Sequence, residues 1–420
     1  MRNFLLEKVF SEHHLYPNGE DVSAHGSFLR EIHFRGKQDC KCIEIKKIAE
    51  SSYLCTSYFV GVDWLKDGKA VYVEPKYLHS DKKTDYFAML FTALKHPNVE
   101  TKDLFEIKFE DNYIEIYQSQ DLLTPLLITH FLRLVKELVR KGLKKSYYKV
   151  ERNLNSRVKG KVLVGQTIKK NIVQNKPLQT FCQYEEFGFD SLENRLLKKA
   201  LLFVQRYLPS FHLPQAELYT TELFNFILPA FISVSEKIEL NEIKHFKSNS
   251  FYKEYTEAIH LAKLILKRFG YNINTIQSQK NIMTPPFWID MSRLYELYVL
   301  GLLKDTYGED VEYHLTTYGN ELDFLLKKQG MEMVIDAKYK PKYQRGLDHS
   351  DIRQVSGYAR LEKVYNKLTK SRNENIDCLI IYPDIEKGIE NFRDVSLKSD
   401  ENKLNEYVGI YKIGIQLPTK

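Results

Sequence analysis

The sequence predicts a mixed α/β protein with a β-rich N-terminal domain over 1–125, a mainly helical middle region over 126–285 and an α/β domain over 286–420. In the first region, short alternating segments are bounded by turn residues, which is typical of strands. In the second, apolar residues recur at helical spacing. In the third, strand and helix patterns follow one another, which is typical of a mixed sheet flanked by helices.

The N-terminal domain contains a predicted hairpin followed by a short helix and a further strand. The dipeptide Asp67-Gly68 is a strong tight-turn signal between two strand-like segments. The helix is expected to end before Pro97, which cannot continue it. The expected elements are strands at 58–65, 70–75 and 113–117 and a helix at 85–94.

The middle region is predicted from helical periodicity. Helices are expected at 122–143, 192–207 and 255–269. The polar stretch 271–286 ends in Pro-Pro and is the best boundary before the last domain. The basic tract 141–149 is interleaved with Tyr147 and Tyr148, so phosphate contact and base stacking stand beside the simpler interpretation of a solvated tract.

Alternation in residues 321–338 predicts a β-hairpin that brings two aspartates face to face. With the turn centred on Gln329 and Gly330, Asp323 lies opposite Asp336 on one face of the hairpin. The flanking pairs are complementary: Glu321 with Lys338, Leu325 with Val334, and Lys327 with Glu332.

The facing aspartates indicate a metal site. Like charges opposite each other destabilise a sheet, because cross-strand Cβ atoms are only about 5 Å apart. A divalent cation removes that cost, and Mg²⁺ is typically held by one or two carboxylates plus water and substrate phosphate. Lys338 shares the face of Asp336 and is placed to orient or activate water and to offset charge on a phosphate. The alternative is an ordinary hairpin with two solvated aspartates.

The segments around the hairpin add candidate residues. A loop downstream carries Lys340, Lys342 and Arg345, charges that suit a phosphate backbone or simply a solvated surface. A helix is expected over 350–368 with Ser350 as N-cap, followed by a buried strand at 378–382 that completes a β-α-β unit.

Three polar residues on the predicted helices complete the candidate set. Gln354 and Tyr358 are four residues apart and share a helix face near the carboxyl end of the preceding strand. Glu296 lies near the middle of an amphipathic helix expected over 291–303 and is a third acidic candidate because that helix precedes the hairpin.

The order of these residues resembles a known family. Glu296, then Asp323, then Asp336-Ala337-Lys338 and then Gln354-x-x-x-Tyr358 is similar to the restriction-endonuclease-like PD-(D/E)XK nucleases. More narrowly, the chain resembles McrC, the nuclease subunit of McrBC-type restriction systems. The narrower resemblance rests on segments 158–162, 190–197, 291–296 and 334–339.

The resemblance implies a PD-(D/E)XK fold for the C-terminal domain and a specific site. It implies metal coordination by Asp323, Asp336 and Glu296, and water activation or charge stabilisation by Lys338. Mg²⁺ is the expected cofactor, with Mn²⁺ as a possible substitute. The predicted DNA-binding or supporting residues are Gln354, Tyr358, Lys340 and Lys342.

The resemblance also implies partners. DNA is the expected substrate, and the N-terminal domain is expected to engage an AAA+ NTPase motor similar to McrB. The sequence contains no Gly-x-x-x-x-Gly-Lys-Ser/Thr phosphate loop, so hydrolysis of GTP or ATP is expected to come from that partner.

Composition agrees with a globular protein that has a polyanionic partner. The 420 residues carry a net charge of +7, with 43% hydrophobic and 28% charged residues and a mean hydropathy of -0.41. The first ten residues do not resemble a signal peptide and no apolar run is long enough to cross a bilayer, so a cytoplasmic protein without membrane contact is expected. Five scattered cysteines argue against a disulfide framework, and Cys40 and Cys42 lack a second pair at zinc-site spacing.

The sequence therefore predicts an Mg²⁺-dependent DNA endonuclease subunit of an NTP-dependent restriction or antiviral defence complex. Two alternatives stay open. One is a stand-alone nuclease of the same fold that acts in repair or on branched DNA. The other is a non-catalytic adaptor that activates an NTPase ring.

Overall fold

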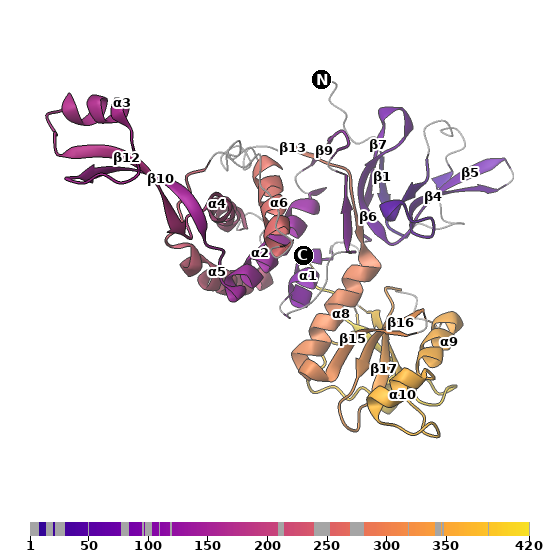
Figure 1. Cartoon of the computed structure of the whole chain (residues 1–420). Helices are drawn as coiled ribbons and strands as arrows, with labels where there is room; N and C mark the ends of the chain where they lie inside the picture. The colour runs from indigo at the N-terminus through magenta and orange to yellow at the C-terminus, as the bar shows by residue number, and fades with distance from the viewer. Residues whose placement is uncertain are drawn as a thin grey trace. The chain divides into compact units, whose positions relative to one another are not determined.

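A computed structural model describes most of the chain (Figure 1). The described residues are 8–13, 20–21, 30–48, 50–76, 84–94, 96, 103–108, 110–117, 120–208, 214–238, 253–268, 281–317, 319–340, 346, 348–384 and 386–419. The chain divides into two compact units. Unit 1 contains residues 1–126 and 280–420, and unit 2 contains residues 127–279. The predicted N-terminal and C-terminal domains thus fall into one unit.

The N-terminal part of unit 1 is built from two sheets. A five-stranded sheet has the order β1 (Lys8–Ser11), β7 (Ala70–Glu74), β6 (Phe59–Trp64), β14 (Phe287–Asp290), β8 (Phe105–Ile107). A four-stranded sheet has the order β2 (Glu20–Asp21), β5 (Ser51–Thr56), β4 (Lys41–Ile48), β3 (Ile32–His33). β6 and β7 pair antiparallel, which confirms the predicted hairpin.

Two short strands, one inside the predicted boundary at 271–286 and one directly after it, pair with strands of the N-terminal part of unit 1. β13 (Asn281–Thr284) pairs with β9 (Ile114–Tyr117), and β14 inserts between β6 and β8. Trp288 of β14 is fully buried, and its indole N–H donates to Asp63 Oδ2 at 2.9 Å. The sequence did not predict these strands, because each has four residues and Pro-Pro stands between them. Residues 269–280 of that boundary lie outside the described residues.

The C-terminal part of unit 1 is a five-stranded mixed sheet. Its strands are β15 (Val311–Thr317), β16 (Asn320–Leu326), β17 (Met333–Ala337), β18 (Asp377–Pro383) and β19 (Ile410–Ile415), in that order. The first three pair antiparallel and the last three pair parallel. A mixed α/β fold is therefore confirmed.

Helices cover this sheet. α9 (His349–Tyr358) and α10 (Glu362–Leu368) connect β17 to β18, which confirms the predicted β-α-β unit. Figure 1 shows them on one side of the sheet and α8 (Met291–Tyr307) on the other. The core beneath α9 and α10 includes Val334, Ile352, Val355, Val364 and Ile380.

The prediction of a single helix over 350–368 is wrong in two details. Its N-cap is Asp348, whose Oδ1 accepts the Ser350 N–H at 3.0 Å, so Ser350 lies inside the first turn. The helix is also interrupted. Leu361 is extended and its N–H donates to Tyr358 O at 3.1 Å, which tightens the end of α9 before α10 begins.

Unit 2 combines the three predicted helices with a further long helix, at 214–227, and a hairpin, neither of which the sequence predicted. Its described helices are α2 (Leu123–Lys141), which starts in unit 1, α4 (Leu192–Tyr207), α5 (Pro214–Ile227) and α6 (Lys253–Arg268). The hairpin pairs β10 (Ser146–Asn155) with β12 (Gln179–Gly188) and carries β11 (Lys161–Val162) and α3 (Val164–Thr167). One face of the hairpin is partly buried around Leu154, Cys182 and Tyr184, but Arg152 and Glu186 interrupt the apolar positions of that face, so the sequence alternation is weak.

One helix packs closely against another in unit 1. α1 (Tyr86–Leu94) packs against α8. The sequence predicted this helix at 85–94, so its bounds agree to within one residue. None of the helices among the described residues combines the length and the apolar character that a membrane span requires.

We predict that Gly301→Ala lowers the melting temperature of the protein. A Cβ at Gly301 would lie 2.6 Å from the carbonyl oxygen of Thr92 in α1, so the two helices must separate. Overpacking of this kind costs about 1–3 kcal/mol. Thermal unfolding followed by circular dichroism measures the change.

The control is Gly357→Ala in α9, where no atom lies within 4 Å of the added Cβ. That change is expected to stabilise the helix by roughly 0.5–1 kcal/mol, because alanine loses less backbone entropy. Equal melting temperatures for the two variants would contradict the close approach of α1 and α8.

Candidate active site

The two predicted aspartates are carried by neighbouring antiparallel strands, β16 and β17. The paired residues are Phe324 with Ile335, Leu325 with Val334, and Leu326 with Met333. This register is the predicted one, and it places Asp323 opposite Asp336 one step beyond the last pair. The turn is also where it was predicted. Gly330 adopts φ +77°, a conformation that favours glycine.

The backbone pairing of β16 and β17 ends one residue before the two aspartates, and beyond it side-chain contacts connect the strands. Asp323 Oδ2 accepts the backbone N–H of Ala337 at 2.8 Å. Asp336 is only 1% exposed, and its Oδ2 lies 2.9 Å from the Lys338 ammonium. The ammonium is therefore the partner of this buried oxygen.

A chain of hydrogen bonds links Lys338 to α9. Lys338 Nζ donates to Gln354 Oε1 at 3.0 Å, and Gln354 Nε2 donates to Tyr358 Oη at 2.7 Å. The structure thus brings both predicted helix residues together with Lys338, because the crossover from β17 places the first turns of α9 beside the end of that strand. The amide of Gln354 fixes the direction of the ammonium.

Burial and mutual repulsion disfavour the negative charges of the aspartates. Burial raises the pKa of Asp323 well above its usual value, and the charges of Asp336 and Glu296 add to the effect. Burial also raises the pKa of Asp336, although Lys338 opposes it. For Lys338, burial acts to lower the pKa, but the neighbouring aspartates outweigh it and the pKa is raised. The Lys338 ammonium therefore stays charged, whereas keeping both carboxylates ionised costs folding free energy.

This donor set fits a hard divalent cation. Carboxylate oxygens are the ligands that Mg²⁺ prefers, and two of them with water complete many protein sites. The Lys338 ammonium already lies against the buried Asp336 Oδ2, and added positive charge would further offset the repulsion between the aspartates. Among the same residues, no group of three or more histidine, cysteine or acidic side chains is arranged to hold a metal. The two aspartates are thus the metal candidates.

Glu296 is engaged by other partners. Its Oε1 lies 2.9 Å from Arg293 Nη1 and 2.6 Å from His314 Nε2. Burial acts to raise the pKa of Glu296, but these two partners outweigh it and the pKa is lowered. His314 adopts φ +54° at the β15 position opposite Asp323, and its Nδ1 lies 2.6 Å from Glu321 Oε1. A role of Glu296 as metal ligand stays a prediction.

Arg293 and His314 were not singled out from the sequence. Arg293 lies three residues before Glu296, a spacing at which opposite charges meet on a helix, and that signal was available. His314 lies on β15, which the sequence did not predict, and its left-handed backbone has no sequence signal.

The predicted basic loop is described only in part. Lys340 Nζ lies 2.8 Å from Asp351 and 3.3 Å from Asp348, so its charge is offset by the first turn of α9. Lys342 and Arg345 lie outside the described residues. DNA binding by Lys340 and Lys342 stays a prediction.

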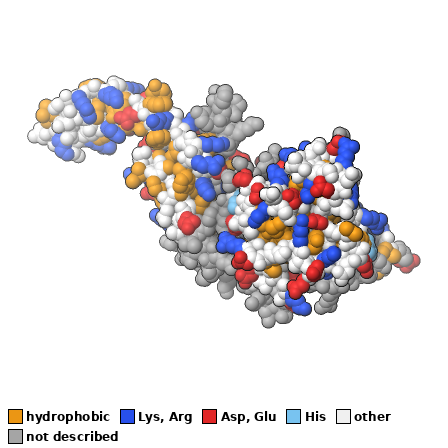
Figure 2. Space-filling model, turned by 90° about the horizontal axis from the view of Figure 1, so that it is seen from below, with side chains coloured by type: hydrophobic (Ala, Val, Ile, Leu, Met, Phe, Trp, Pro, Cys, Tyr) orange, Lys and Arg blue, Asp and Glu red, His pale blue; other side chains and the backbone are white. Residues whose placement is uncertain are grey.

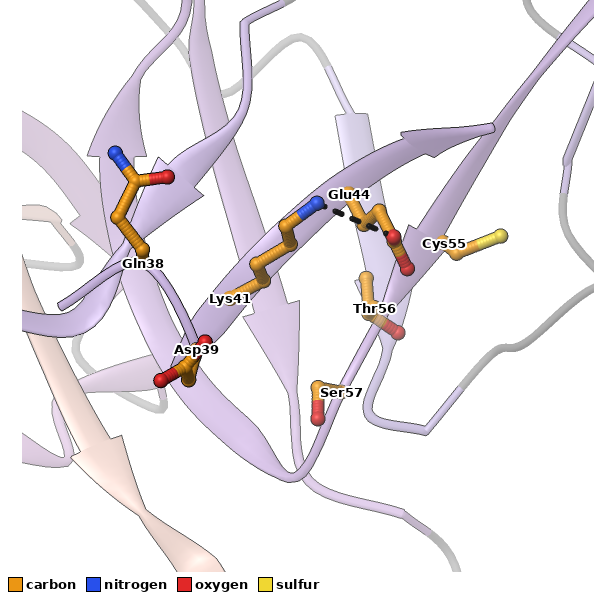
Figure 3. A pocket seen from close by; sticks show the side chains of 7 residues that line it. All are labelled: Gln38, Asp39, Lys41, Glu44, Cys55, Thr56 and Ser57. Atoms are coloured by element: carbon orange, nitrogen blue, oxygen red, sulfur yellow. Dashed lines mark hydrogen bonds and ion pairs between the residues drawn. The ribbon is translucent and has the colours of Figure 1, made fainter. Parts of the chain in front are cut away.

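A separate polar hollow of about 380 Å³ lies among residues of β4, β5 and their flanking turns, between Gln38 and Ser57 (Figure 3). The Lys41 ammonium in it is neutralised by Glu31 and Glu44 at 3.2 and 3.3 Å. None of the predicted site residues lines this hollow. It offers no converging set of catalytic groups.

The hairpin of unit 2 exposes apolar and basic side chains. On the face seen in Figure 2, hydrophobic, lysine and arginine side chains are interspersed over the far end of the hairpin, at the left of the view. The exposed apolar residues there include Val164, Ile168, Ile172, Val173 and Leu178. Within the predicted basic tract, Tyr147 is exposed and its ring lies 5.1 Å from that of Phe187. Contact between this tract and DNA stays a prediction.

Residues 54–383 match the family model described as "McrBC 5-methylcytosine restriction system component". No curated protein matches the chain.

Two solved structures are similar to this chain. One is the refined half-complex from the tetradecameric assembly of Thermococcus gammatolerans McrB AAA+ hexamers with bound McrC, with 16% identity, a TM-score of 0.40, and coverage of 97% of this chain and 94% of that chain. The other is the cryo-EM structure of the Thermococcus gammatolerans McrBC complex, with 17% identity, a TM-score of 0.29, and coverage of 70% and 86%.

We predict that Asp323→Asn raises stability in the absence of divalent cations. Because the pKa of Asp323 is raised in the folded chain, that chain binds a proton more tightly than the unfolded chain does, and ionisation costs stability as the pH rises. Asparagine keeps an oxygen for the Ala337 N–H and removes the charge. The gain is expected to be on the order of 1 kcal/mol near pH 9 and to shrink toward pH 5.

Thermal unfolding in chelator across this pH range measures the gain. Asp336→Asn is the contrast, because it leaves the half-buried Lys338 ammonium without its counter-charge and is not expected to stabilise. A wild-type protein that is as stable as Asp323→Asn at high pH would contradict the repulsion.

Proposed function

The chain belongs to the McrBC 5-methylcytosine restriction system component family, and from that premise we propose that it is the McrC-like, Mg²⁺-dependent endonuclease subunit of an NTP-dependent restriction complex that cleaves DNA. The observation that carries the proposal is the convergence of Asp323, Asp336 and Lys338 at the adjoining ends of β16 and β17. Three ionisable groups at one buried position are costly, and such groups concentrate at catalytic sites.

The mixed sheet supports a restriction-endonuclease-like fold for the C-terminal part of unit 1. Its central antiparallel strands carry the two acidic groups, and a parallel crossover returns α9 to the same edge. In this proposal the PD-(D/E)XK motif is formed by Asp323 from β16 and by Asp336-Ala337-Lys338 at the end of β17.

Each residue of the site has a defined task in the proposal. Asp323 and Asp336 hold Mg²⁺, or Mn²⁺ in its place, through carboxylate oxygens. When bound, the ion lowers the pKa of water and withdraws charge from a phosphate oxygen. Lys338 keeps its proton, because its pKa is raised, and stabilises the negative charge that develops on the phosphate. Gln354 accepts a hydrogen bond from Lys338 and holds the ammonium in that direction.

The proposal includes a polyanionic substrate and a protein partner. The net charge of +7 favours association with DNA. The partner is an AAA+ NTPase similar to McrB. An exposed apolar cluster of the kind seen on the unit 2 hairpin is typical of protein contact surfaces, which supports a protein partner.

We predict that Asp336→Ala and Lys338→Ala each abolish cleavage by the assembled complex. Removal of Lys338 takes away charge stabilisation at the phosphate, which is expected to cost at least about 10²-fold in rate. Removal of Asp336 takes away one of two carboxylates for the metal. Plasmid cleavage with the AAA+ partner and Mg²⁺, with GTP and ATP in separate reactions, measures both.

Lys327→Ala is the matched control, since Lys327 follows β16 and pairs with Glu312 at 3.1 Å, away from the aspartates. Its cleavage rate is expected to match the wild type. Undiminished cutting by Asp336→Ala or Lys338→Ala would refute the assigned site. Cutting by the isolated chain without any nucleotide would instead identify a stand-alone nuclease, and NTPase stimulation without cutting would identify an adaptor.

We predict that Val173→Asp weakens partner-dependent cleavage without destabilising the chain. Val173 is 77% exposed on the hairpin of unit 2, so a carboxylate there disturbs an apolar contact surface and little else. The concentration of AAA+ partner that gives half-maximal cleavage is expected to rise about 10-fold, or roughly 1.4 kcal/mol.

Val408→Asp is the control, because Val408 is an 82% exposed valine in unit 1. An equal effect of both variants, or no effect of Val173→Asp, would remove the hairpin from the partner surface.

A further inference from the structure

Tyr339 directly follows Lys338 just beyond the end of β17. The Lys338 N–H donates to Ile381 O of β18 at 2.8 Å, and the Lys340 N–H turns back to Lys338 O at 2.7 Å. This tight turn is centred on Tyr339. Its side chain is buried, at 5% exposed, although it directly follows the residue that carries the catalytic ammonium.

The hydroxyl of Tyr339 is bound by the N-terminal part of unit 1. Tyr339 Oη donates to Glu12 Oε1 at 2.8 Å. Glu12 directly follows β1, and its own N–H donates to Glu74 O at the end of β7 at 2.9 Å. A single hydrogen bond therefore connects the five-stranded N-terminal sheet to the end of β17.

Aromatic rings enclose that bond. The Tyr339 ring lies 5.9 Å from that of Tyr58, edge to face, and 5.5 Å from that of Tyr295 on α8. Tyr58 in turn stacks on His13 at 4.1 Å and lies within hydrogen-bonding distance of its Nε2. Water is excluded from the Glu12 carboxyl, which is 2% exposed.

The buried carboxyl is an expensive group for a structural contact. Burial raises the pKa of Glu12 to about 7, and the negative charge of Asp290 raises it further. The hydrogen bond from Tyr339, the backbone hydrogen bond from Lys76 and the charge of Lys76 act to lower the pKa but do not outweigh burial. A hydrophobic residue would fill this position at lower cost, so the polar contact indicates a role beyond packing.

We propose that Glu12 and Tyr339 are positioning residues, whose carboxyl–phenol hydrogen bond anchors the end of β17 to the N-terminal sheet and so sets the placement of the Lys338 ammonium. The inference rests on the proposed function for the role of Lys338. It adds that the catalytic geometry depends on the N-terminal sheet. Neither residue touches the substrate.

The test uses the full-length chain with its AAA+ partner and compares kcat and KM for DNA cleavage by the wild type and five variants. Tyr339→Phe removes only the hydroxyl and is expected to lower kcat about 10- to 100-fold, with KM for DNA within about 2-fold, because misplacement of a catalytic group by about 1 Å costs up to about 10²-fold. Glu12→Leu is expected to have the same effect.

Glu12→Gln is the rescue variant, since its amide oxygen still accepts the Tyr339 hydroxyl, and its kcat is expected to stay within about 3-fold of wild type. The double variant Glu12→Leu, Tyr339→Phe is expected to be no slower than either single variant, because both remove one bond. A Tyr339→Phe enzyme with wild-type kcat, or additive losses in the double variant, overturns the proposal.

Tyr298→Phe is the matched control. Tyr298 is a buried tyrosine on α8 whose hydroxyl donates to Gln416 O at 3.1 Å, remote in sequence from β17. Its loss also removes a buried hydrogen bond but is expected to leave kcat unchanged. An equal loss in kcat would assign the effect to general destabilisation and overturn the positioning role.

Amide hydrogen exchange separates this inference from the proposed function. In Tyr339→Phe, the amides of Lys338 and Lys340 are expected to exchange about 10-fold faster, with the amides of β18 unchanged. If the wild-type complex cleaves no DNA, the proposed function fails, and the exchange data still decide the anchoring. Unchanged exchange at Lys338 and Lys340 overturns it.

Discussion

The repulsion between the buried carboxylate of Asp336 and the half-buried carboxylate of Asp323 is the constraint on which the candidate site depends. Asp323 and Asp336 face one another in a sheet whose next pair on the same face is Leu325 with Val334. An apolar pair at the aspartate positions would be more stable, because it would need neither the Ala337 N–H nor the Lys338 ammonium. The sheet carries the free-energy cost of two facing carboxylates at one pair of positions and not at the next. Groups held at such a cost concentrate at functional sites, which supports the proposed catalytic role.

The strand end that carries Lys338 is held from two sides. On one side, the crossover from β17 to β18 brings α9 back so that Gln354 accepts a hydrogen bond from the ammonium. On the other, Tyr339 is bound to Glu12 beside the N-terminal sheet. Lys338 and Tyr339 are adjacent in the chain just after β17, so one short segment meets both supports. The placement of the ammonium therefore depends on elements more than three hundred residues apart in the chain.

The sequence predicted the pairing of β16 and β17 better than the strands around them, for physical reasons. The register of β16 and β17 followed from alternation and one turn, and the helices followed from apolar periodicity. In β10 and β12 the partly buried face mixes Leu154, Cys182 and Tyr184 with Arg152 and Glu186, so the apolar period is weak. The choice between Asp348 and Ser350 as N-cap was not decidable, since both residue types cap well. The left-handed backbone at His314 is imposed by tertiary contacts and has no local signal.

The chain order gives the N-terminal sheet a second connection to the site. β14 belongs to that sheet, and α8 begins directly after it, with the Met291 N–H donating to Tyr58 O at 2.9 Å. Asp290 caps the helix by accepting the Arg293 N–H at 3.0 Å, and Arg293 in turn holds Glu296. The N-terminal sheet is therefore connected to Glu296 through α8 and Arg293. It is connected to Lys338 through the hydrogen bond between Glu12 and Tyr339. A displacement of that sheet would therefore move Glu296 and Lys338 together. The N-terminal sheet thus helps to set the positions of the proposed catalytic groups.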